Sequence, residues 1–289
     1  MKVNVIGATG QLGRKVIGEL LKQGAVPTDL IASIRSPDKA RDLAEQGVDV
    51  RRADYDDPPS LHEAFQGTDL LLIIPSLAHV EQRILQHFNA LEAAKQSKVK
   101  RVVFASFMAA TPTSKFLIAP FMLYAESKLR LSGLEWTILR DGMYLDPVAE
   151  WVPQLVQTGR LPYPVEKGRV AYICRDDIAR ALAAACLGDG HSGQLYELTG
   201  PEALSMPGLA EAISRATGKP VEFQQISEDE YGDICRADNT PEPMIEFLTS
   251  MYRAVDNGEF EIVTDHVERL TGTPPESVES YLRRAVHDV

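Results

Sequence analysis

Residues 1–21 read MKVNVIGATGQLGRKVIGELL and place three glycines, Gly7, Gly10 and Gly13, between an apolar run and an amphipathic one. The apolar run is short and favours a strand, whereas the amphipathic one has its apolar residues at helical spacing. Between a first parallel strand and its helix, Gly7 lets the chain turn, Gly10 lets a pyrophosphate approach the backbone, and Gly13 lets the helix pack closely. The stretch therefore predicts a dinucleotide site.

The alternation of strand and helix continues along most of the chain. Six further segments predict strands, at 30–35, 48–54, 69–74, 100–106, 135–140 and 169–174. The segments between them predict helices, at 36–47, 60–67, 79–98, 124–134 and 175–188. Ser36 and Pro37 are typical of an N-cap and a first helical position, and we expect Asp176 or Asp177 to cap the last helix. Buried parallel strands joined by helices predict an α/β, doubly wound Rossmann fold.

The pattern changes beyond about residue 190, where short β-prone runs precede a mostly helical tail. We expect residues 1–140 to form the NAD(P)-binding Rossmann core, with a further strand-helix unit at about 165–188. Residues 141–164 and 189–289 are expected to form a smaller C-terminal α/β substrate lobe, because no linker rich in Pro, Gly or Ser separates a second domain.

Composition and charge narrow the class of protein. The chain has 289 residues, 44% of them hydrophobic, and a formal net charge of −11, so its field would repel a nucleic-acid backbone. The run DLLLIIPSLA is too short to cross a bilayer, and no signal segment is evident. Cys174, Cys186 and Cys235 form no CxxC pair, which favours reduced thiols over disulfides or a metal site. We expect a soluble cytoplasmic protein without a nucleic-acid or membrane partner and without a metal, and the oligomeric state stays open.

The end of the second predicted strand bears on the choice between NAD and NADP. NAD-binding proteins place an acid there for the adenosine ribose, whereas NADP-binding proteins place a cation for the 2′-phosphate. This strand ends at Arg35, and Lys39 follows one turn later. Asp38 lies in the first turn of the next predicted helix, where the helix dipole already explains an acid. Arg35 is either a plain surface charge or a phosphate ligand, and its position favours NADPH over NADH.

Further cofactor contacts are expected where the first helix starts and where the next strands end, because these points meet at one edge of the sheet. Asp54 suits the adenine amino group, or else it is a turn acid before Pro58. The cofactor candidates are Gly7, Thr9, Gly10, Gln11, Leu12, Gly13, Arg35, Lys39, Asp54, Tyr55, Pro75, Ser76 and Ser106.

Four stretches, VIGATGQLG, ASIRSPDKA, GLEWTILRDGMY and ICRDDIARAL, resemble the NmrA-like branch of the atypical short-chain dehydrogenases/reductases. The resemblance covers essentially the whole chain. The tail, with TPEPMIEFLTSMYRAVDNGEFE and TDHVERLTGTPPESVESYLRRAV, is similar to the subgroup of NAD(P)H-dependent quinone reductases and triphenylmethane-dye reductases. The resemblance implies hydride transfer from a nicotinamide cofactor to a quinone or a related conjugated, dye-like small molecule.

Ordinary short-chain dehydrogenases use a Tyr-x-x-x-Lys pair for proton transfer, and Tyr124 and Lys128 have that spacing on a predicted helix. The alignment of the chain with the family opposes proton transfer by this pair. When the chain is aligned on SGLEWTILR, the Glu common in the family falls on Glu126, and the position of a Lys or His in relatives falls on Met122. We therefore expect Tyr124 and Lys128 to be surface residues, with catalytic duty as the alternative, and we assign no other catalytic side chain.

Hydride transfer to a planar acceptor needs orientation and exclusion of solvent, and the product can take its proton from water. Apolar and aromatic residues after the fifth and sixth strands suit this role, although they equally suit a core. Asp141 stands where the family usually has Asn, and we expect it to favour a cationic acceptor. The substrate candidates are Phe107, Met108, Asp141, Met143 and Tyr144.

Two functions from different classes follow from the sequence. The first is an NADPH-dependent oxidoreductase that reduces a quinone or a related conjugated acceptor. The second is a non-catalytic NAD(P)-binding redox sensor that acts through a protein partner, and the departures at Met122 and Asp141 keep it open. A nucleotide-sugar epimerase or lyase would need a working pair at Tyr124 and Lys128.

Overall fold

Seven strands form the main sheet of the computed structural model, which describes residues 1–287. They are β1 (Val3–Ile6), β2 (Leu30–Ile34), β3 (Asp49–Arg52), β4 (Leu70–Ile73), β5 (Arg101–Phe107), β6 (Glu135–Asp141) and β9 (Gln194–Leu198). The strand order is β3-β2-β1-β4-β5-β6-β9, so the order reverses at β1. Val3 pairs in parallel with Leu30 of β2 and with Leu70 of β4. The predicted parallel Rossmann sheet is confirmed.

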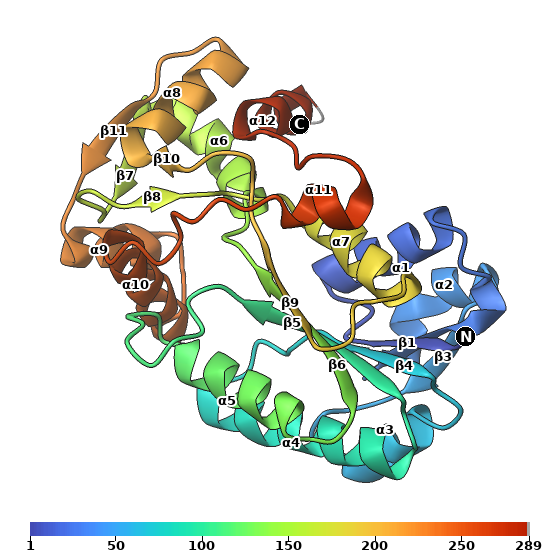
Figure 1. Cartoon of the computed structure of the whole chain (residues 1–289). Coiled ribbons are helices and arrows are strands. Elements are labelled where there is room, and N and C mark those ends of the chain that lie inside the picture. Colours follow the sequence, from blue (N-terminus) through green and yellow to red (C-terminus); the bar gives the residue numbers. More distant parts are fainter. Residues whose placement is uncertain (288–289) are drawn as a thin grey trace. The chain divides into compact units, whose positions relative to one another are not determined.

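Helices cover both faces of this sheet (Figure 1). One face carries α3 (Pro58–Ala64), α4 (Val80–Gln96) and α5 (Ala119–Arg130), and the other carries α1 (Gln11–Lys22), α2 (Arg41–Glu45) and α7 (Arg175–Leu187). Every residue of β1, β2 and β4 is buried, as expected of parallel strands between two helical layers. In α1, Leu12, Val16 and Leu20 recur every four residues and form the buried stripe. Helices on both faces of the parallel sheet give the fold its doubly wound arrangement.

The predicted strand at 169–174 is wrong as a member of the main sheet. Only β8 (Arg169–Val170) is a strand, and it pairs antiparallel with β10 (Leu204–Ser205). Ile173 donates its N–H to the Met143 carbonyl, 3.0 Å away, and the residues around it are buried in an irregular segment. A continuous apolar run indicates burial, and burial here does not require a sheet.

The seventh place in the sheet belongs to β9, which sequence analysis assigned to the smaller lobe. Gly193 donates its N–H to the Trp136 carbonyl at 2.7 Å, and Gly142 donates to the Leu198 carbonyl at 2.8 Å. Both contacts advance in the same direction along β6 and β9, so the pairing is parallel. The strand-helix unit expected at about 165–188 therefore covers the sheet with α7 but adds no strand to it.

The predicted helix at 36–47 is split into two pieces. It begins as the 3₁₀ turn η2 (Pro37–Ala40) and continues as α2, with a second short 3₁₀ turn, η1 (Pro27–Asp29), before β2. Ser36 is the N-cap of η2 but makes no side-chain capping hydrogen bond. Ala40 has φ −130°, outside the helical region, and this residue separates the two pieces.

The start of α7 also differs from the prediction. The Asp146 carboxylate accepts the N–H of Arg175 at 2.9 Å, so the cap comes from a distant part of the chain. Asp176 and Asp177 lie inside the first turn of the helix. The Asp177 carboxylate accepts the N–H of Glu276 at 2.7 Å. The prediction that Asp176 or Asp177 caps this helix is therefore wrong.

The chain divides into two compact units. The first consists of Met1–Phe107, Phe121–Arg140 and Ile178–Glu197, and the second of Met108–Pro120, Asp141–Asp177 and Leu198–Val289. All the cofactor candidates named above lie in the first unit, together with nearly all of the main sheet. Every substrate candidate except Phe107 lies in the second unit.

The second unit has small sheets and a core of its own. β7 (Arg160–Tyr163) pairs in parallel with β11 (Glu222–Gln225). Its helices are α6 (Asp146–Thr158), α8 (Met206–Thr217), α9 (Glu228–Ala237), α10 (Glu242–Asp256), α11 (His266–Thr271) and α12 (Val278–His287). Tyr163, Tyr231 and Tyr252 pack with ring centroids 4.9, 5.1 and 6.2 Å apart. These buried aromatic rings stabilise the unit.

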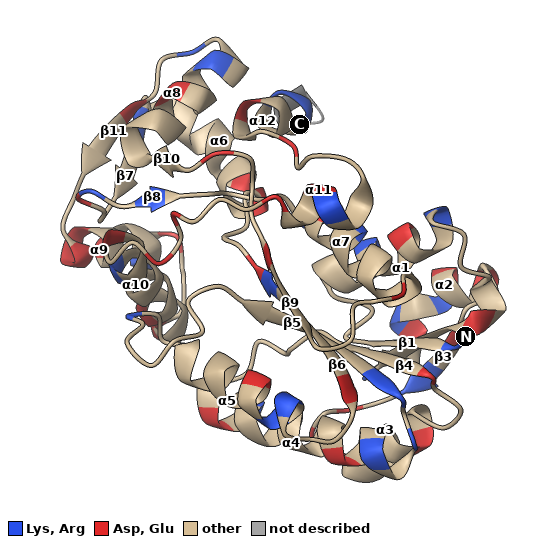
Figure 2. Ribbon diagram, in the orientation of Figure 1, with Lys and Arg blue, Asp and Glu red and all other residues tan. Residues whose placement is uncertain are grey.

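Residues of both charge signs are interspersed over the helices (Figure 2). Within residues 1–287, no helix is long and apolar enough to cross a membrane, and no cluster of His, Cys, Asp and Glu has the arrangement of a metal site. The three cysteines are free and buried. Burial raises the pKa of Cys174 and Cys186 to about 12, so these thiols are uncharged and poor nucleophiles at neutral pH.

Candidate dinucleotide and active site

A crevice of about 560 Å³ opens in the first unit where β1, β2, β3 and β4 end. Eight of the predicted cofactor residues line it: Gly7, Thr9, Gly10, Arg35, Asp54, Tyr55, Pro75 and Ser76. The crevice lies where the strand order reverses at β1, and open α/β sheets bind their ligands at such switch points. The sheet therefore brings together residues that follow four separate strands.

Gly7 and Gly13 occupy positions where a side chain does not fit. Gly7 has φ 87°, and a Cβ there would lie 3.0 Å from the Ile74 carbonyl oxygen. A Cβ at Gly13 would lie 2.3 Å from the Gly7 carbonyl oxygen, so α1 packs directly on the turn. Gly10 is different, because a Cβ there would make only an ordinary contact of 3.4 Å with the Gly7 carbonyl oxygen. Gly10 itself lines the crevice. Its missing side chain leaves room for a ligand.

The start of α1 presents backbone donors. α1 begins at Gln11, directly after Gly10, and no acid lies in its first turn. The first N–H groups of a helix have no intrahelical acceptor and lie at the positive end of the helix dipole. Gln11 is exposed, whereas Leu12 and Gly13 are buried and do not line the crevice, so these two residues have only backbone groups to offer. The turn and the helix start fit a diphosphate.

Arg35 follows β2 and lines the crevice with an exposed side chain. In the part of the chain that the structure describes, its guanidinium has no hydrogen bond or ion pair. Asp38 is paired with Arg41 at 3.3 Å. Lys39 does not line the crevice, and its carbonyl oxygen accepts a hydrogen bond from Arg14. Arg35 is therefore available to a phosphate, and the crevice fits NADPH.

Asp54 and Tyr55 follow β3. The Asp54 carboxylate accepts the N–H of Asp56 at 3.1 Å, and the Asp54 N–H donates to the Ser60 hydroxyl at 3.0 Å. Asp54 thus has the turn role that the sequence allowed as its alternative, while it also lines the crevice. The Tyr55 hydroxyl donates to the Ile74 carbonyl at 2.8 Å, and burial raises the pKa of this phenol. Tyr55 holds the segments after β3 and β4 together.

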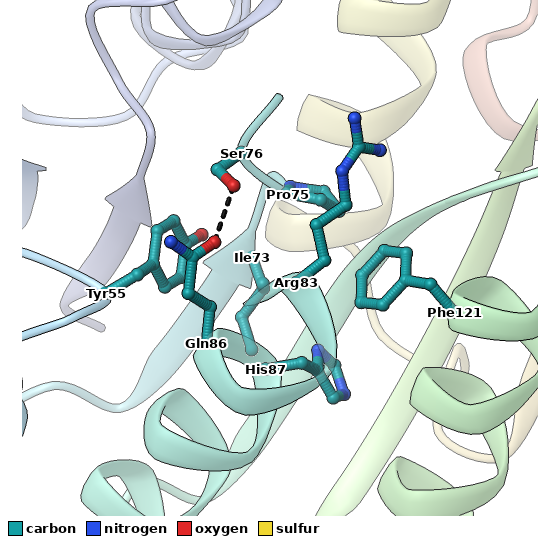
Figure 3. A pocket seen from close by; sticks show the side chains of 8 residues that line it. All are labelled: Tyr55, Ile73, Pro75, Ser76, Arg83, Gln86, His87 and Phe121. Carbon is teal, nitrogen blue, oxygen red and sulfur yellow. Dashed lines mark hydrogen bonds between the residues drawn. The ribbon is translucent and has the colours of Figure 1, made fainter. Parts of the chain in front are cut away.

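Pro75 and Ser76 follow β4, and Ser76 is connected to the helix after it. The Ser76 hydroxyl donates to Gln86 Oε1 at 2.5 Å (Figure 3), and the Gln86 amide donates to the two Asp56 oxygens at 3.1 and 3.0 Å. Gln82 also donates to Asp56, at 3.0 Å. Gln82 and Gln86 line the crevice as well, although neither was among the predicted cofactor residues. Their spacing of four on the helix after Ser76 was the available signal, since it places both on one face.

Ser106 does not line the crevice and belongs to a buried polar network. Its hydroxyl donates to Glu126 at 2.8 Å. Arg140 donates to the two Glu126 oxygens at 2.8 and 2.9 Å, and Arg130 adds a contact at 3.0 Å. Glu126 is fully buried, and its carboxylate raises the pKa of Arg140. Buried charges need such partners, so Glu126 connects α5 to β5 and β6.

The Tyr-x-x-x-Lys spacing lies on α5, away from the crevice lining. Tyr124 is half-buried, Lys128 is exposed, and the Lys128 ammonium lies 5.6 Å from the centroid of the Tyr124 ring. Met122 is buried, with its sulfur 3.8 Å from the Ser106 hydroxyl. Met122 therefore brings no titratable group to Ser106, and the other α5 side chain there, Glu126, is held by Arg130 and Arg140.

Four of the five substrate candidates come together in the second unit. Met108 donates its N–H to the Asp141 carbonyl at 2.9 Å, and the Tyr144 hydroxyl donates to Asp141 Oδ2 at 2.9 Å. Met143 is buried in the same segment. Phe107 ends β5 in the first unit and is partly exposed. Asp141 is 2% exposed, and its Oδ1 has no hydrogen-bond partner among the described residues.

The charge of Asp141 follows from its burial. Burial raises the pKa of this carboxyl to about 8, although the hydrogen bond from Tyr144 opposes the shift. The nearby Arg175 guanidinium lies 5.0 Å from the Tyr144 ring centroid and pairs with Asp146 at 3.4 Å. Asp141 is therefore mostly neutral at pH 7. The expected preference for a cationic acceptor requires a pH at which this carboxyl ionises.

A parallel sheet whose order reverses at β1, with a glycine turn and an unpaired arginine in the switch-point crevice, defines a Rossmann-type dinucleotide-binding protein. Comparison with known sequences gives the particular family. The chain belongs to the NmrA-like family, whose sequence profile matches residues 1–282.

Individual relatives agree with this assignment. The chain is 34% identical over 273 residues to quinone oxidoreductase 2 of Escherichia coli (strain K12), with 94% of each chain covered. The crystal structure of an NADPH-dependent quinone oxidoreductase from Escherichia coli complexed with NADPH matches with a TM-score of 0.93 at 32% identity, covering 98% of this chain and 99% of that chain. Citrobacter sp. triphenylmethane reductase complexed with NADP(H) also gives 0.93, at 30% identity, covering 98% and 100%. The resemblance found in the sequence is confirmed.

Proposed function

We propose that this protein is an NADPH-dependent oxidoreductase that transfers a hydride to a quinone or a related conjugated, dye-like acceptor. The observation that carries the proposal is the switch-point crevice, where a glycine turn suited to a diphosphate and the unpaired Arg35 line one cavity. The names of the similar proteins support it, since they include a quinone oxidoreductase and a triphenylmethane reductase, and the solved structures hold NADPH or NADP(H).

In this proposal, Gly7, Gly10 and the first turn of α1 hold the diphosphate, Arg35 holds the 2′-phosphate, and Asp54 faces the adenine. NADPH, when bound, supplies a hydride, which carries one proton and two electrons. NADH lacks the 2′-phosphate and therefore loses the contact with Arg35. The protein contributes orientation and a dry surface for the transfer.

A quinone acceptor gains the hydride and then one further proton, whereas a cationic dye gains the hydride alone. We propose that water supplies this proton, because Met122 stands beside Ser106 and neither Tyr124 nor Lys128 lines the crevice. Each quinone turnover then consumes one NADPH, one quinone and one proton. The proposed acceptor contacts remain Phe107, Met108, Asp141, Met143 and Tyr144, supported by their place at or just after the ends of β5 and β6.

The test is direct. Purified protein is mixed with NADPH and a panel of quinones and triarylmethane dyes, and the loss of nicotinamide absorbance is followed. We expect oxidation well above the protein-free rate, with NADPH preferred to NADH. Binding of NADPH without any oxidation would refute the enzyme and favour the redox sensor that acts through a protein partner.

We also propose a small-molecule acceptor as the physiological partner and a cytoplasmic location. The three unpaired, buried thiols support the location, because an oxidising compartment favours disulfides. Fractionation of the producing cells, followed by detection of the protein with an antibody, tests it.

A further inference from the structure

Arg83 is a buried cation beside the crevice. It lies in the first turn of α4, and the residue is only 8% exposed. Its Nε donates to the Ala78 carbonyl at 2.6 Å, and its guanidinium carbon lies 5.9 Å from the centroid of the Phe121 ring. These are its only side-chain contacts of these kinds among the described residues, and both leave the two terminal nitrogens without an acceptor.

The surroundings do not neutralise this charge. No carboxylate in residues 1–287 forms an ion pair with Arg83, and Glu81, the acid of the same helical turn, is exposed. His87, which lines the same small pocket, is neutral at pH 7 because burial lowers its pKa to about 4. Burial without an anion also lowers the pKa of Arg83 itself. The terminal nitrogens of Arg83 are not among the fully enclosed polar atoms that lack a partner, so they reach solvent and are open to a ligand that supplies the negative partner.

The small pocket with Arg83 adjoins the dinucleotide crevice. Tyr55, Pro75, Ser76 and Gln86 line both. Figure 3 shows the Arg83 guanidinium extending past Pro75, with Phe121 on the side away from Tyr55 and Ser76. The first N–H groups of α4 lie in the same region and add the positive end of a helix dipole.

The order of the strands indicates which end of the dinucleotide this is. Arg35 follows β2, on one side of β1, whereas the segment that leads to Arg83 follows β4, on the other side. A dinucleotide lies across the switch point, so the end away from Arg35 is the nicotinamide end. Arg83 therefore belongs with the acceptor rather than with the adenosine.

We propose that Arg83 contacts a carbonyl oxygen of the acceptor and stabilises the negative charge that develops there during reduction. The inference rests on the proposed function and identifies carbonyl acceptors, quinones above all, as the substrate class that Arg83 favours. A quinone that gains a hydride becomes a hydroquinone monoanion, with its negative charge on oxygen, and then takes one proton from water. A positioned donor in a site that excludes water stabilises such an oxyanion strongly.

A cationic dye provides the internal comparison. A triarylmethane cation that gains a hydride becomes neutral and forms no oxyanion. Arg83 therefore gives no advantage to dye reduction, and its positive charge opposes binding of the dye. A merely structural Arg83 would affect both acceptors alike.

The test compares Arg83→Gln and Arg83→Lys with wild type and with Lys95→Gln, a control on the same helix in which an exposed lysine loses its ion pair with Glu92. Turnover of p-benzoquinone and of a cationic triarylmethane dye is measured with NADPH, together with the NADPH dissociation constant and the melting temperature. A further measurement needs no turnover: 4-nitrophenolate, a stable phenolate ion, is titrated into the protein saturated with NADP+.

We expect Arg83→Gln to lower kcat/KM for the quinone by about a hundredfold, to leave NADPH binding unchanged, and to cause no loss of dye turnover, because the charge that opposes dye binding is removed. Its phenolate dissociation constant should rise by roughly tenfold to a hundredfold. Arg83→Lys should recover part of the loss because it keeps the charge, and Lys95→Gln should behave as wild type. Since Arg83→Gln removes an unpaired buried charge, its melting temperature should not fall.

Three results would overturn the inference. They are equal losses for quinone and dye, weakening of NADPH binding by the same factor as quinone turnover, and phenolate binding that does not change in Arg83→Gln. A wild-type protein that reduces neither acceptor refutes the proposed function, whereas one that reduces both while Arg83→Gln matches it refutes only the role of Arg83.

Discussion

Replacement of Arg35 by serine should separate NADPH from NADH. The guanidinium is exposed at the crevice, and no carboxylate among the described residues holds it, so it loses no partner when it binds a phosphate. At about 4 Å in a solvent-like dielectric, each unit of phosphate charge contributes about 1 kcal/mol. Hydrogen bonds to charged groups contribute about 1.5–3 kcal/mol, and this range covers the expected total. The NADPH dissociation constant should therefore rise by roughly tenfold to a hundredfold in Arg35→Ser, with NADH unaffected.

Isothermal titration calorimetry with both dinucleotides, at low and high salt, measures this effect. The difference between wild type and Arg35→Ser should shrink at high salt because exposed charges are screened. Arg41→Ser is the matched control, since Arg41 is an exposed arginine nearby that is already paired with Asp38. Equal weakening of NADPH and NADH in Arg35→Ser, or an equal effect of Arg41→Ser on NADPH, would show that Arg35 does not recognise the 2′-phosphate.

Three further predictions concern the turn, a buried acid and α5. Gly13→Ala places a Cβ 2.3 Å from the Gly7 carbonyl oxygen, so it should lower the free energy of unfolding by about 1–3 kcal/mol and weaken dinucleotide binding. Gly18→Ala is the control: nothing lies within 4 Å of its Cβ, and it should raise the free energy of unfolding by about 0.5–1 kcal/mol. Thermal melts and dinucleotide titrations that rank the two variants alike would contradict this prediction. The carboxyl of Asp141 has a pKa of about 8 in the folded protein and of about 4 in the unfolded chain. Between these pH values the folded state keeps a proton that the unfolded chain loses. The free energy of unfolding should therefore fall as pH rises from about 4 to 8, by on the order of 1 kcal/mol per pH unit. Asp141→Asn should remove this slope in melts across that range, and should weaken cationic-dye turnover only near pH 8 and above; parallel stability curves would disprove the ionisation argument. Tyr124→Phe should leave kcat/KM for quinone unchanged, because Tyr124 does not line the crevice, and a loss of activity in a steady-state assay would restore proton transfer from α5.

The structure differs from the sequence-based predictions where two segments compete for the same place in the fold. The run at 169–174 is apolar enough for a buried strand, but β9, with its mixed exposed and buried residues, pairs with β6 instead. Periodicity reports how buried a segment is, and it does not report which of two segments takes the free edge of a sheet. For the same reason the cap of α7 was assigned to the nearest acids, although Asp146 supplies it from a distance.

The sequence by itself determined the glycine turn at the end of the first strand, the alternation of strands and helices, and the arginine after the second strand. These features depend on spacing along the chain and on the backbone freedom of glycine, which are local properties. Only the tertiary structure decided that Arg83 is a buried cation without an anion, that Asp141 keeps its proton near neutral pH, and that Glu126 holds two arginines. The charge and reactivity of such groups depend on neighbours brought from other elements and on the exclusion of water, and neither is written in the residues adjacent in sequence.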